Sequence, residues 1–530
     1  MSFISRNKKT DKLHEGIKND SFDFEQIERY FREKKHSGSF QKLSAKTCND
    51  IDFQELFQFI DRTSSKVGQQ FLYDKLRSIP LNQDDFPNTE ALISELIKNP
   101  GLQQQLKKQI SKLNHEDAYY ITSLFQEEHA KPPKWYSIIR LLAFTSVLSL
   151  ILLFINPNMV FVLAGVFIVN MFIHYWNKRN VYQYLNSIPQ LLKLNNVAKE
   201  LYKTYALKVI KPNLTESIEI LNKVRNRMSF FKLEAKIQGD MEAIFWGIME
   251  LFKILFIMEP LLLFGVLKEL DSKRKEIEDV FQFVGEVDSL LSIIALRQGL
   301  EKYCLPEFID SVKIIAANEV YHPLIENCVC NSIKANKKSV LLTGSNMSGK
   351  TSFIRTIAIN AITAQTINTC FAEKFVLPRM NIRSAIRISD DLMNDKSYYF
   401  EEVITIKEMI DSSSSDYPNL FLLDEIFKGT NTIERISAGK AVLSALAKNN
   451  NIVFVSTHDI ELADLLEDEF GLYHFSEIIN ENTVGFDYKI KAGKLKNRNA
   501  LRILQMNGYP EEVIQEALNL SATLDMANQS

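Results

Sequence analysis

The stretch Gly344-Ser-Asn-Met-Ser-Gly349-Lys350-Thr351 decides the fold of the C-terminal part of this chain. It fits the pattern G-x-x-x-x-G-K-[ST], and it lies between a short apolar run, Ser339–Thr343, and a helical pattern, which is the context that this motif requires. Glycines let backbone amides curl around phosphates, and the N-terminus of the following helix adds partial positive charge. The stretch therefore predicts a phosphate-binding loop.

Two side chains of this loop have specific predicted roles. Lys350 would reach the β- and γ-phosphates of a nucleotide, and the hydroxyl of Thr351 would bind Mg²⁺. ATP and Mg²⁺ are thus the predicted cofactors. The residues predicted to bind the nucleotide within one chain are Gly344, Ser345, Asn346, Met347, Ser348, Gly349, Lys350, Thr351 and Ser352.

Two more apolar runs end in side chains that suit ATP hydrolysis. Asn419–Leu423 is followed by Asp424 and Glu425, placed to hold the magnesium shell and to polarise the attacking water, respectively. Ile452–Ser456 is followed shortly by His458, which could hydrogen-bond the γ-phosphate and report its loss. The predicted catalytic residues are Lys350, Glu425 and His458, and the predicted metal ligands are Thr351 and Asp424. This order of motifs is typical of the ABC-type branch of P-loop ATPases, in which a second subunit completes each site.

The pattern along the chain predicts an α/β P-loop ATPase domain that follows an all-α core. Short apolar runs alternate with helical patterns in residues 306–530, which indicates a parallel sheet covered by helices. Residues 21–130 and 178–305 show helical periodicity and are predicted to form the two parts of the helical core. Residues 1–20 are expected to be a disordered tail.

Residues 136–177 interrupt the helical core with two apolar runs, Ile138–Ile155 and Met159–Trp176. Each is close to the ~20 residues needed to cross a bilayer as a helix, and basic residues flank the pair while none lies in the turn. The segment therefore predicts a two-helix transmembrane hairpin with both ends in the cytoplasm, so that the ATPase domain is cytoplasmic and the protein lies in the inner membrane. The alternative is a buried helical hairpin in a soluble domain, which Asn170 and His174 allow.

The apolar stretch Met241–Leu267 is interrupted by charged residues, which are costly in the middle of a membrane span. It is therefore predicted to be a core or dimer-contact helix. A formal net charge of −2 excludes a strongly basic coat for nucleic acid, although it allows a local basic groove. The five cysteines show no zinc-site spacing and are read as reduced thiols.

The motifs taken together resemble the MutS family, the ATPases of DNA mismatch repair. The phosphate loop is similar to the family's G-P-N-M-x-G-K-S-T, and Leu423-Asp-Glu-Ile426 with Gly429-Thr430-Asn-Thr432 matches its D-E-I-x-x-G-T-x-T. Further matching stretches are Tyr321-His-Pro-Leu-Ile325, Ser389-Asp-Asp-Leu392, Lys396 to Glu402, Ser456-Thr-His458 and Glu461-Leu462. Glu286-Val-Asp288 through Pro306 and Thr63 to Pro80 resemble the two ends of the family's helical core.

The resemblance implies a homodimer with two composite sites, in which Ser397 reaches the γ-phosphate bound by the partner subunit. It also implies DNA as a ligand. The residues before the helical core are too few for the family's mismatch-reading domain, so the chain is expected to be a short, membrane-anchored member that lacks it. Phe53-Gln-Glu55 has the spelling of the family's mismatch wedge but lies in the helical-core match. Phe427 and Lys428 also depart from the family pattern.

Three functions can be compared on the basis of these observations. The first is a membrane-anchored, dimeric MutS-like ATPase that couples ATP binding and hydrolysis to conformational change and binds DNA. The second is a membrane-associated scaffold whose ATP switch acts on a protein partner without DNA. An ABC transporter is disfavoured, because two spans are too few to form a path and no Gly-Gly-Gln signature is present.

Overall fold

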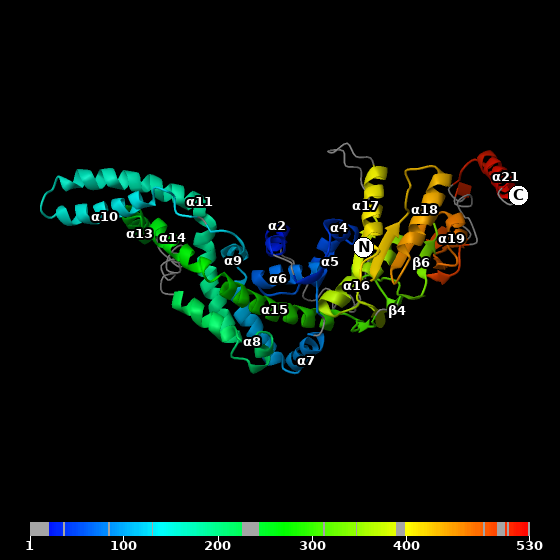
Figure 1. Ribbon diagram of the computed structural model, residues 1–530, viewed down its shortest axis with the longest axis horizontal. Coiled ribbons are helices and arrows are strands. Elements are labelled where there is room, and N and C mark those ends of the chain that lie inside the picture. The colour runs from blue at the N-terminus through cyan, green and yellow to red at the C-terminus, as the bar shows by residue number, and fades with distance from the viewer. Residues whose placement is uncertain are drawn as a thin grey trace, which may run out of the picture. The chain divides into compact units, whose positions relative to one another are not determined.

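The computed structural model describes most of the chain, namely residue 18 and residues 21–34, 38–82, 85–129, 131–224, 243–310, 313–345, 347–387, 398–480, 483–495, 504–505 and 508–527 (Figure 1). These residues divide into two compact units. The helical unit comprises residues 1–37, 60–75 and 84–299, and the sheet unit comprises residues 38–59, 76–83 and 300–530. The predicted tail, residues 1–20, lies outside the described residues except for Lys18.

The helical unit contains no strand among its described residues, as its periodicity predicted. Its helices before the apolar runs are α2 (Phe24–Ile27), α3 (Arg29–Glu33), α6 (Lys66–Arg77, which ends in the sheet unit), α7 (Phe86–Ile97), α8 (Pro100–Ile110), η1 (Ser111–Leu113), η2 (Glu116–Thr122) and α9 (Ser123–Gln126). Those that follow are α10 (Tyr136–Leu152), α11 (Met159–Leu201), η3 (Tyr205–Val209), α13 (Ala243–Phe256), α14 (Met258–Asp271) and α15 (Arg274–Gly299).

Helix α15 forms the centre of the helical unit, and α6 packs closely against it. Asp288 on α15 is completely buried and accepts hydrogen bonds from the Ser64 N–H (2.8 Å), the Ser65 N–H (2.9 Å) and the Ser65 hydroxyl (2.6 Å). These contacts satisfy backbone donors at the start of α6, which have no partner within the helix. A Cβ on Gly68 would lie 2.1 Å from the Asp288 carboxylate, so the close approach requires glycine there.

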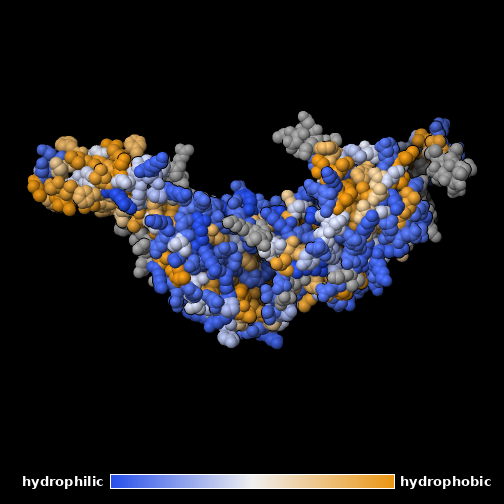
Figure 2. Space-filling model, in the orientation of Figure 1, coloured by the Kyte–Doolittle hydropathy of each residue, from blue (hydrophilic) through white to orange (hydrophobic). Residues whose placement is uncertain are grey.

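Helices α10 and α11 form an antiparallel hairpin, and its outer surface is apolar (Figures 1 and 2). Phe154 and Phe161 near its tip are 92% and 76% exposed, and only 11% of the Met159–Trp176 window is buried. The alternative of a hairpin buried in this chain's own core is therefore wrong for α11. The rings of Trp135 and Trp176, at the other end of the hairpin, have centroids 5.2 Å apart.

The helix lengths support one candidate membrane span rather than two. Among the helices that the structure describes, α11 alone is long and apolar enough by length and composition, over Met159–Trp176. Helix α10 is also apolar but has 17 residues, fewer than the ~20 that typically cross a bilayer core. The prediction of two spans is thus not supported, because the first apolar run leaves helical geometry after Leu152, before the run itself ends at Ile155.

The sheet unit is α/β, as its apolar runs predicted. Its main sheet has the order β14-β11-β6-β10-β9-β8 within the described residues, with every neighbouring pair parallel except β11 and β14. These strands are β6 (Ser339–Thr343), β8 (Asn381–Ala385), β9 (Asn419–Asp424), β10 (Ile452–Thr457), β11 (Phe470–His474) and β14 (Lys491–Ala492). The three strands predicted from the sequence are β6, β9 and β10, which lie side by side and are buried almost throughout.

Helices cover this sheet, and smaller sheets adjoin it. The covering helices are α16 (Lys350–Ile367), α17 (Tyr398–Ser412), α18 (Thr432–Leu446) and α19 (Ile460–Leu465), and α21 (Glu511–Ala527) follows them at the C-terminal end. A second sheet has the order β3-β7-β4-β5, and β12 and β13 form a hairpin. The strands are β3 (Glu307–Phe308), β4 (Ile314–Val320), β5 (Asn331–Asn336), β7 (Lys374–Leu377), β12 (Glu477–Asn480) and β13 (Thr483–Phe486).

Two segments from the N-terminal part of the chain belong to the sheet unit. They contain β1 (Ser39–Lys42), β2 (Ser78–Pro80), α4 (Ala45–Asp50) and most of α5 (Phe53–Ile60). Asp50 at the end of α4 accepts hydrogen bonds from the Ser384 hydroxyl (2.6 Å), the Ile386 N–H (3.0 Å) and the Arg387 N–H (2.8 Å). The sequence-based boundary at residue 306 does not include these segments. Phe53, the aromatic residue of the wedge-like sequence Phe53-Gln-Glu55, is buried within α5.

Candidate functional site

The phosphate loop connects β6 to α16, the context expected from the sequence. Gly344 and Gly349 have φ values of +147° and +104°, a region that favours glycine. A Cβ on Gly344 would lie 2.6 Å from the Phe475 carbonyl oxygen, so a side chain there would have to push the backbone apart. Met347 also has positive φ (66°) and is 84% exposed. Asn346 lies outside the described residues.

Lys350 is the first residue of α16, and its ammonium group lies inside the loop. Its Nζ donates to the carbonyl oxygens of Gly344 (2.7 Å) and Ser345 (2.8 Å). Burial lowers the pKa of Lys350, while the carboxylates of Glu425 and Asp424 act in the opposite direction. A buried ammonium group that is held only by neutral carbonyl oxygens is well placed to exchange them for phosphate oxygens.

Asp424, the last residue of β9, meets Thr351, the second residue of α16. The Thr351 hydroxyl donates to Asp424 Oδ2 at 2.7 Å, and the Ser456 hydroxyl, at the end of β10, hydrogen-bonds Asp424 Oδ1. The structure thus brings the two predicted metal ligands together. A hydroxyl and a carboxylate are oxygen ligands of the kind that Mg²⁺ prefers, so the residues present fit that ion.

Glu425 lies beside Asp424 and is held by the imidazole of His458 and the ammonium group of Lys428. His458 Nε2 is 2.7 Å from Glu425 Oε1, and the ammonium of Lys428 contacts Oε2. Burial raises the pKa of Glu425, but the contacts with His458 and Lys428 outweigh it and bring the pKa to about 2. The carboxylate is therefore ionised at neutral pH. Its φ of 51° is unusual for a non-glycine residue, and such strain gathers at functional sites.

Two neighbours of Glu425 were not assigned roles from the sequence. Glu402, on α17, accepts a hydrogen bond from the Phe427 N–H at 2.7 Å, and burial raises the pKa of Glu402. It thereby ties the residues that follow Glu425 to the helix that begins at Tyr398. Lys428 was noted only as a departure from the family pattern. Its position three residues after Glu425 was the sequence signal for a contact between the two side chains. The assigned trans residue Ser397 lies outside the described residues.

A cavity of about 530 Å³ opens beside the phosphate loop and gives room for a nucleotide. Besides loop residues it is lined by His322, Cys328, Phe475 and Tyr488. Burial, together with the guanidinium of Arg355, lowers the pKa of His322 to about 4, so this imidazole is neutral at pH 7. The lining combines aromatic side chains with polar groups such as Asn331 and Lys350, a mixture that can hold both the base and the phosphates of a nucleotide.

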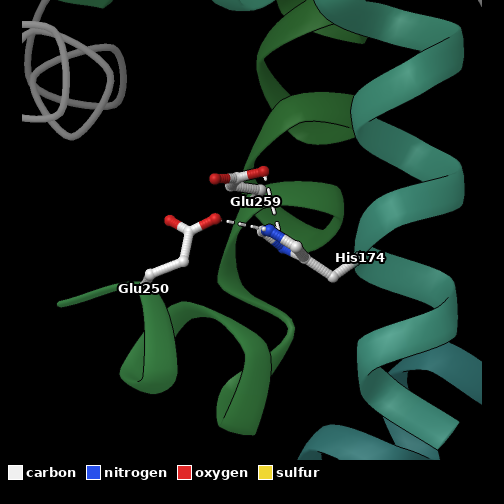
Figure 3. A group of neighbouring side chains, drawn as sticks. All are labelled: His174, Glu250 and Glu259. Atoms are coloured by element: carbon white, nitrogen blue, oxygen red, sulfur yellow. Dashed lines mark hydrogen bonds and ion pairs between the residues drawn. The ribbon is translucent and has the colours of Figure 1, made fainter. Parts of the chain in front are cut away.

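Another cluster, in the helical unit, has the atoms of a metal site: His174, Glu250 and Glu259 (Figure 3). His174 Nε2 lies 3.0 Å from Glu250 Oε1, and its Nδ1 lies 3.6 Å from Glu259 Oε2. Lys253 Nζ lies 2.6 Å from Glu250 Oε2 and 2.9 Å from Glu259 Oε1. The four buried side chains thus form a closed ring in which the ammonium already offsets carboxylate charge. This ring ties α11 to α13 and α14, and it accounts for the charged residues Glu250, Lys253 and Glu259 within Met241–Leu267.

Comparison with known proteins matches the sheet unit to one family. Residues 340–525 match the family model described as MutS domain V. Two relatives are DNA mismatch repair protein MutS from Pseudothermotoga lettingae, 30% identical over 260 residues, and the protein of that name from Thermus thermophilus, 29% identical over 264 residues. Each of these matches covers 47% of this chain and 31% of the relative.

A third relative, DNA mismatch repair protein MutS from Persephonella marina, is 26% identical over 328 residues, which are 60% of this chain and 37% of the relative. The chain therefore spans about a third of the length of the relatives it matches. The matched region contains the phosphate loop, Asp424, Glu425 and His458. Residues 340–525 of this chain are thus similar to MutS domain V.

Proposed function

We propose that this protein is a MutS-type ATPase that binds and hydrolyses ATP and couples the state of the nucleotide to a conformational change of its helical unit. One observation carries the proposal: Lys350, the Thr351–Asp424 pair and the Glu425–His458 pair meet at the carboxyl ends of the parallel strands β6, β9 and β10, beside a cavity that can hold a nucleotide. Each of these groups matches a step that phosphoryl transfer requires.

The chain's own residues would divide the reaction as follows. Lys350 exchanges the carbonyl oxygens of Gly344 and Ser345 for phosphate oxygens. Thr351 and Asp424 hold Mg²⁺, which when bound offsets the charge of the phosphates. Glu425 accepts a hydrogen bond from the attacking water and polarises it, which requires the carboxylate to leave its contacts with Lys428 and His458. His458 would then donate a hydrogen bond to the γ-phosphate.

A homodimer would complete each site, because the ABC-type arrangement needs a residue from the second subunit and Ser397 is the proposed donor. DNA is the proposed ligand of the dimer, held through phosphate contacts rather than by a mismatch wedge. The names of the relatives support this proposal, since each is a DNA mismatch repair protein.

The decisive experiment measures ATP hydrolysis by the purified full-length chain with Mg²⁺, in the presence of homoduplex DNA, heteroduplex DNA or no DNA. We expect Mg²⁺-dependent turnover that DNA stimulates and that Lys350→Ala abolishes. Failure of the wild-type chain to bind ATP with Mg²⁺ would overturn the enzymatic proposal.

A second candidate function rests on the exposed hairpin of α10 and α11. Apolar surface of this extent is costly in water, so it calls for a membrane or a partner. We propose that the apolar surface of the hairpin, with α11 as its candidate span, inserts into the inner (cytoplasmic) membrane while the ATPase stays on the cytoplasmic side, and that the Trp135–Trp176 pair lies at the level of the head groups. If turnover ignores DNA, the alternative of a membrane-associated ATP switch that acts on a protein partner becomes the better account.

A further inference from the structure

Cys304 and Cys370 lie directly opposite each other in the sheet unit. The Cys304 N–H donates to the Cys370 carbonyl oxygen at 3.0 Å, and the Cys370 N–H donates to the Cys304 carbonyl oxygen at 2.9 Å, so the two residues form an antiparallel bridge. In such a hydrogen-bonded pair the Cα atoms are about 5.5 Å apart. This lies within the Cα separation of about 4.4–6.8 Å that a disulfide spans, and closing the bond requires the two Cβ atoms to move slightly closer together.

The two thiols differ in access and in acidity. Cys370 is completely buried, whereas Cys304 is partly exposed. A hydrogen bond between their side chains lowers the pKa of Cys304 against the opposing effect of burial. Burial instead raises the pKa of Cys328 and of Cys330, two other thiols of the sheet unit. The thiolate is the nucleophile in thiol chemistry, so Cys304 is the thiol best placed to react first with a disulfide. Cys370 is then placed to attack the mixed disulfide formed at Cys304.

We propose that Cys304 and Cys370 form a reversible thiol modification site, which a low-molecular-weight disulfide of the glutathione class oxidises to an intramolecular disulfide. The Cys304 thiolate attacks one sulfur of the small disulfide, forms a mixed disulfide and releases one small thiolate. Cys370 gives its proton to solvent, and its sulfur attacks Cys304 Sγ and displaces the second small thiolate. Two protein thiols are oxidised, and one small disulfide is reduced to two thiols.

The position of the bond gives it a consequence for the site. Cys370 follows closely after α16, the helix that carries Lys350 and Thr351 at its start, and Cys304 lies on the segment that enters the sheet unit after α15. The neighbouring Phe371 is fixed by the Asn360 side chain, which accepts its N–H at 2.6 Å. A disulfide would therefore lock the end of α16 to the entering segment. We expect it to raise thermal stability, because it closes a long loop, and to slow any ATP-driven shift of α16.

The modification is tested on the full-length protein treated with oxidised glutathione and then digested without reductant for mass spectrometry. Wild type and the matched control Cys330→Ser should yield a Cys304–Cys370 linked peptide and melt a few degrees higher than their reduced forms. Cys304→Ser and Cys370→Ser should yield no linked peptide and show no rise, and dithiothreitol should reverse both effects in the wild type.

A mixed disulfide that persists at Cys304, or a link between Cys328 and Cys330 instead, would overturn the proposal. The effect on turnover rests on the proposed ATPase function: we expect a several-fold loss in the oxidised wild type but not in Cys304→Ser. Unchanged turnover with a fully formed bond would refute the regulatory role. Absence of ATPase activity in both redox forms would instead count against the proposed function, since the linked peptide and the melting temperature are read independently.

Discussion

At the position of Glu425, backbone and charge both constrain one carboxylate. Its φ is positive, and its oxygens contact His458 and Lys428. We predict that Glu425→Gln keeps ATP binding but lowers turnover at least ~100-fold, because an amide cannot polarise the attacking water as a carboxylate does. Steady-state hydrolysis and nucleotide binding by fluorescence measure the two effects. Glu434→Gln, an exposed change of the same chemistry at the start of α18, should leave turnover intact, and unchanged turnover in Glu425→Gln would contradict its role.

Asp288 makes stability depend on pH in an unusual direction. Burial raises its pKa from 3.8 to about 6, although hydrogen bonds from Ser65 and Ser64 oppose this. Between pH 4 and 6 the folded chain thus keeps a proton that the unfolded chain has lost, so this group's contribution to the free energy of unfolding falls as pH rises through that range. It stays low above pH 6. The total change is on the order of 1–3 kcal/mol.

Urea unfolding of wild type and Asp288→Asn at several pH values isolates this contribution. The stability difference, wild type minus variant, should decrease from pH 4 to pH 6 and then level off. The exposed Asp416→Asn serves as the control, and its difference should stay flat. A difference for Asp288→Asn that grows with pH would mean that the carboxylate is ionised in the folded state throughout.

At the scale of elements, the contact between α6 and α15 depends on the absence of a side chain. A Cβ on Gly285 would lie 2.6 Å from Cβ and Cγ of Phe71. Gly285→Ala gains up to about 1 kcal/mol of helix propensity, but the overpacking costs about 1–3 kcal/mol, so we expect a net loss of stability. Gly265→Ala is the matched control, because nothing lies within 4 Å of its added Cβ and it should be neutral or stabilising. The measurement is the urea midpoint of unfolding of each variant relative to wild type. An equal increase of the midpoint in both variants would refute the close contact at Gly285.

The hairpin of α10 and α11 yields a prediction about location. Deleting Ile138–Trp176 should release the protein from membranes, and Phe161→Arg should weaken its binding, since arginine in the apolar part of a bilayer costs about 2.5–3.5 kcal/mol. Flotation with liposomes measures binding. Tyr205→Arg, a change of an exposed aromatic residue outside the hairpin, should float like wild type. Full-length protein that remains entirely soluble would count against the anchor.

The elements differ in how far the sequence could predict them. β6, β9 and β10 were predictable because each is a short, continuously apolar run that ends in a polar motif, and the order of motifs placed Asp424 beside Thr351. The contact of Lys428 with Glu425 depends on the turn after β9, where Glu425 and Phe427 adopt positive φ without a glycine to signal it. The ring of His174, Glu250, Lys253 and Glu259 depends on pairing helices that are far apart in the sequence, which local periodicity does not encode.

For the whole molecule, the response to salt separates the two candidate functions. If the protein neutralises DNA phosphates, the DNA concentration that half-maximally stimulates ATP hydrolysis should rise steeply between 50 and 200 mM salt, with a slope in the logarithms of about 0.9 per phosphate contact. Turnover without DNA should change far less over the same range, which is the internal control. Turnover that DNA never affects, at any salt concentration, would favour the scaffold function.

The sheet unit is built from segments that lie far apart in the sequence, which affects both the order of folding during synthesis and the choice of fragments that can fold. Residues 38–59 and 76–83 are synthesised long before the rest of the sheet unit, so the Asp50 carboxylate is hydrogen-bonded to water until Ser384 and its neighbours emerge from the ribosome. Folding of the nucleotide-binding half is therefore a late event that spans nearly the entire polypeptide. By the same reasoning, a fragment beginning at residue 300 would leave three polar groups of the Asp50 contact without their acceptor. A shortened chain that is meant to fold like the complete sheet unit should therefore include residues 38–59 and 76–83.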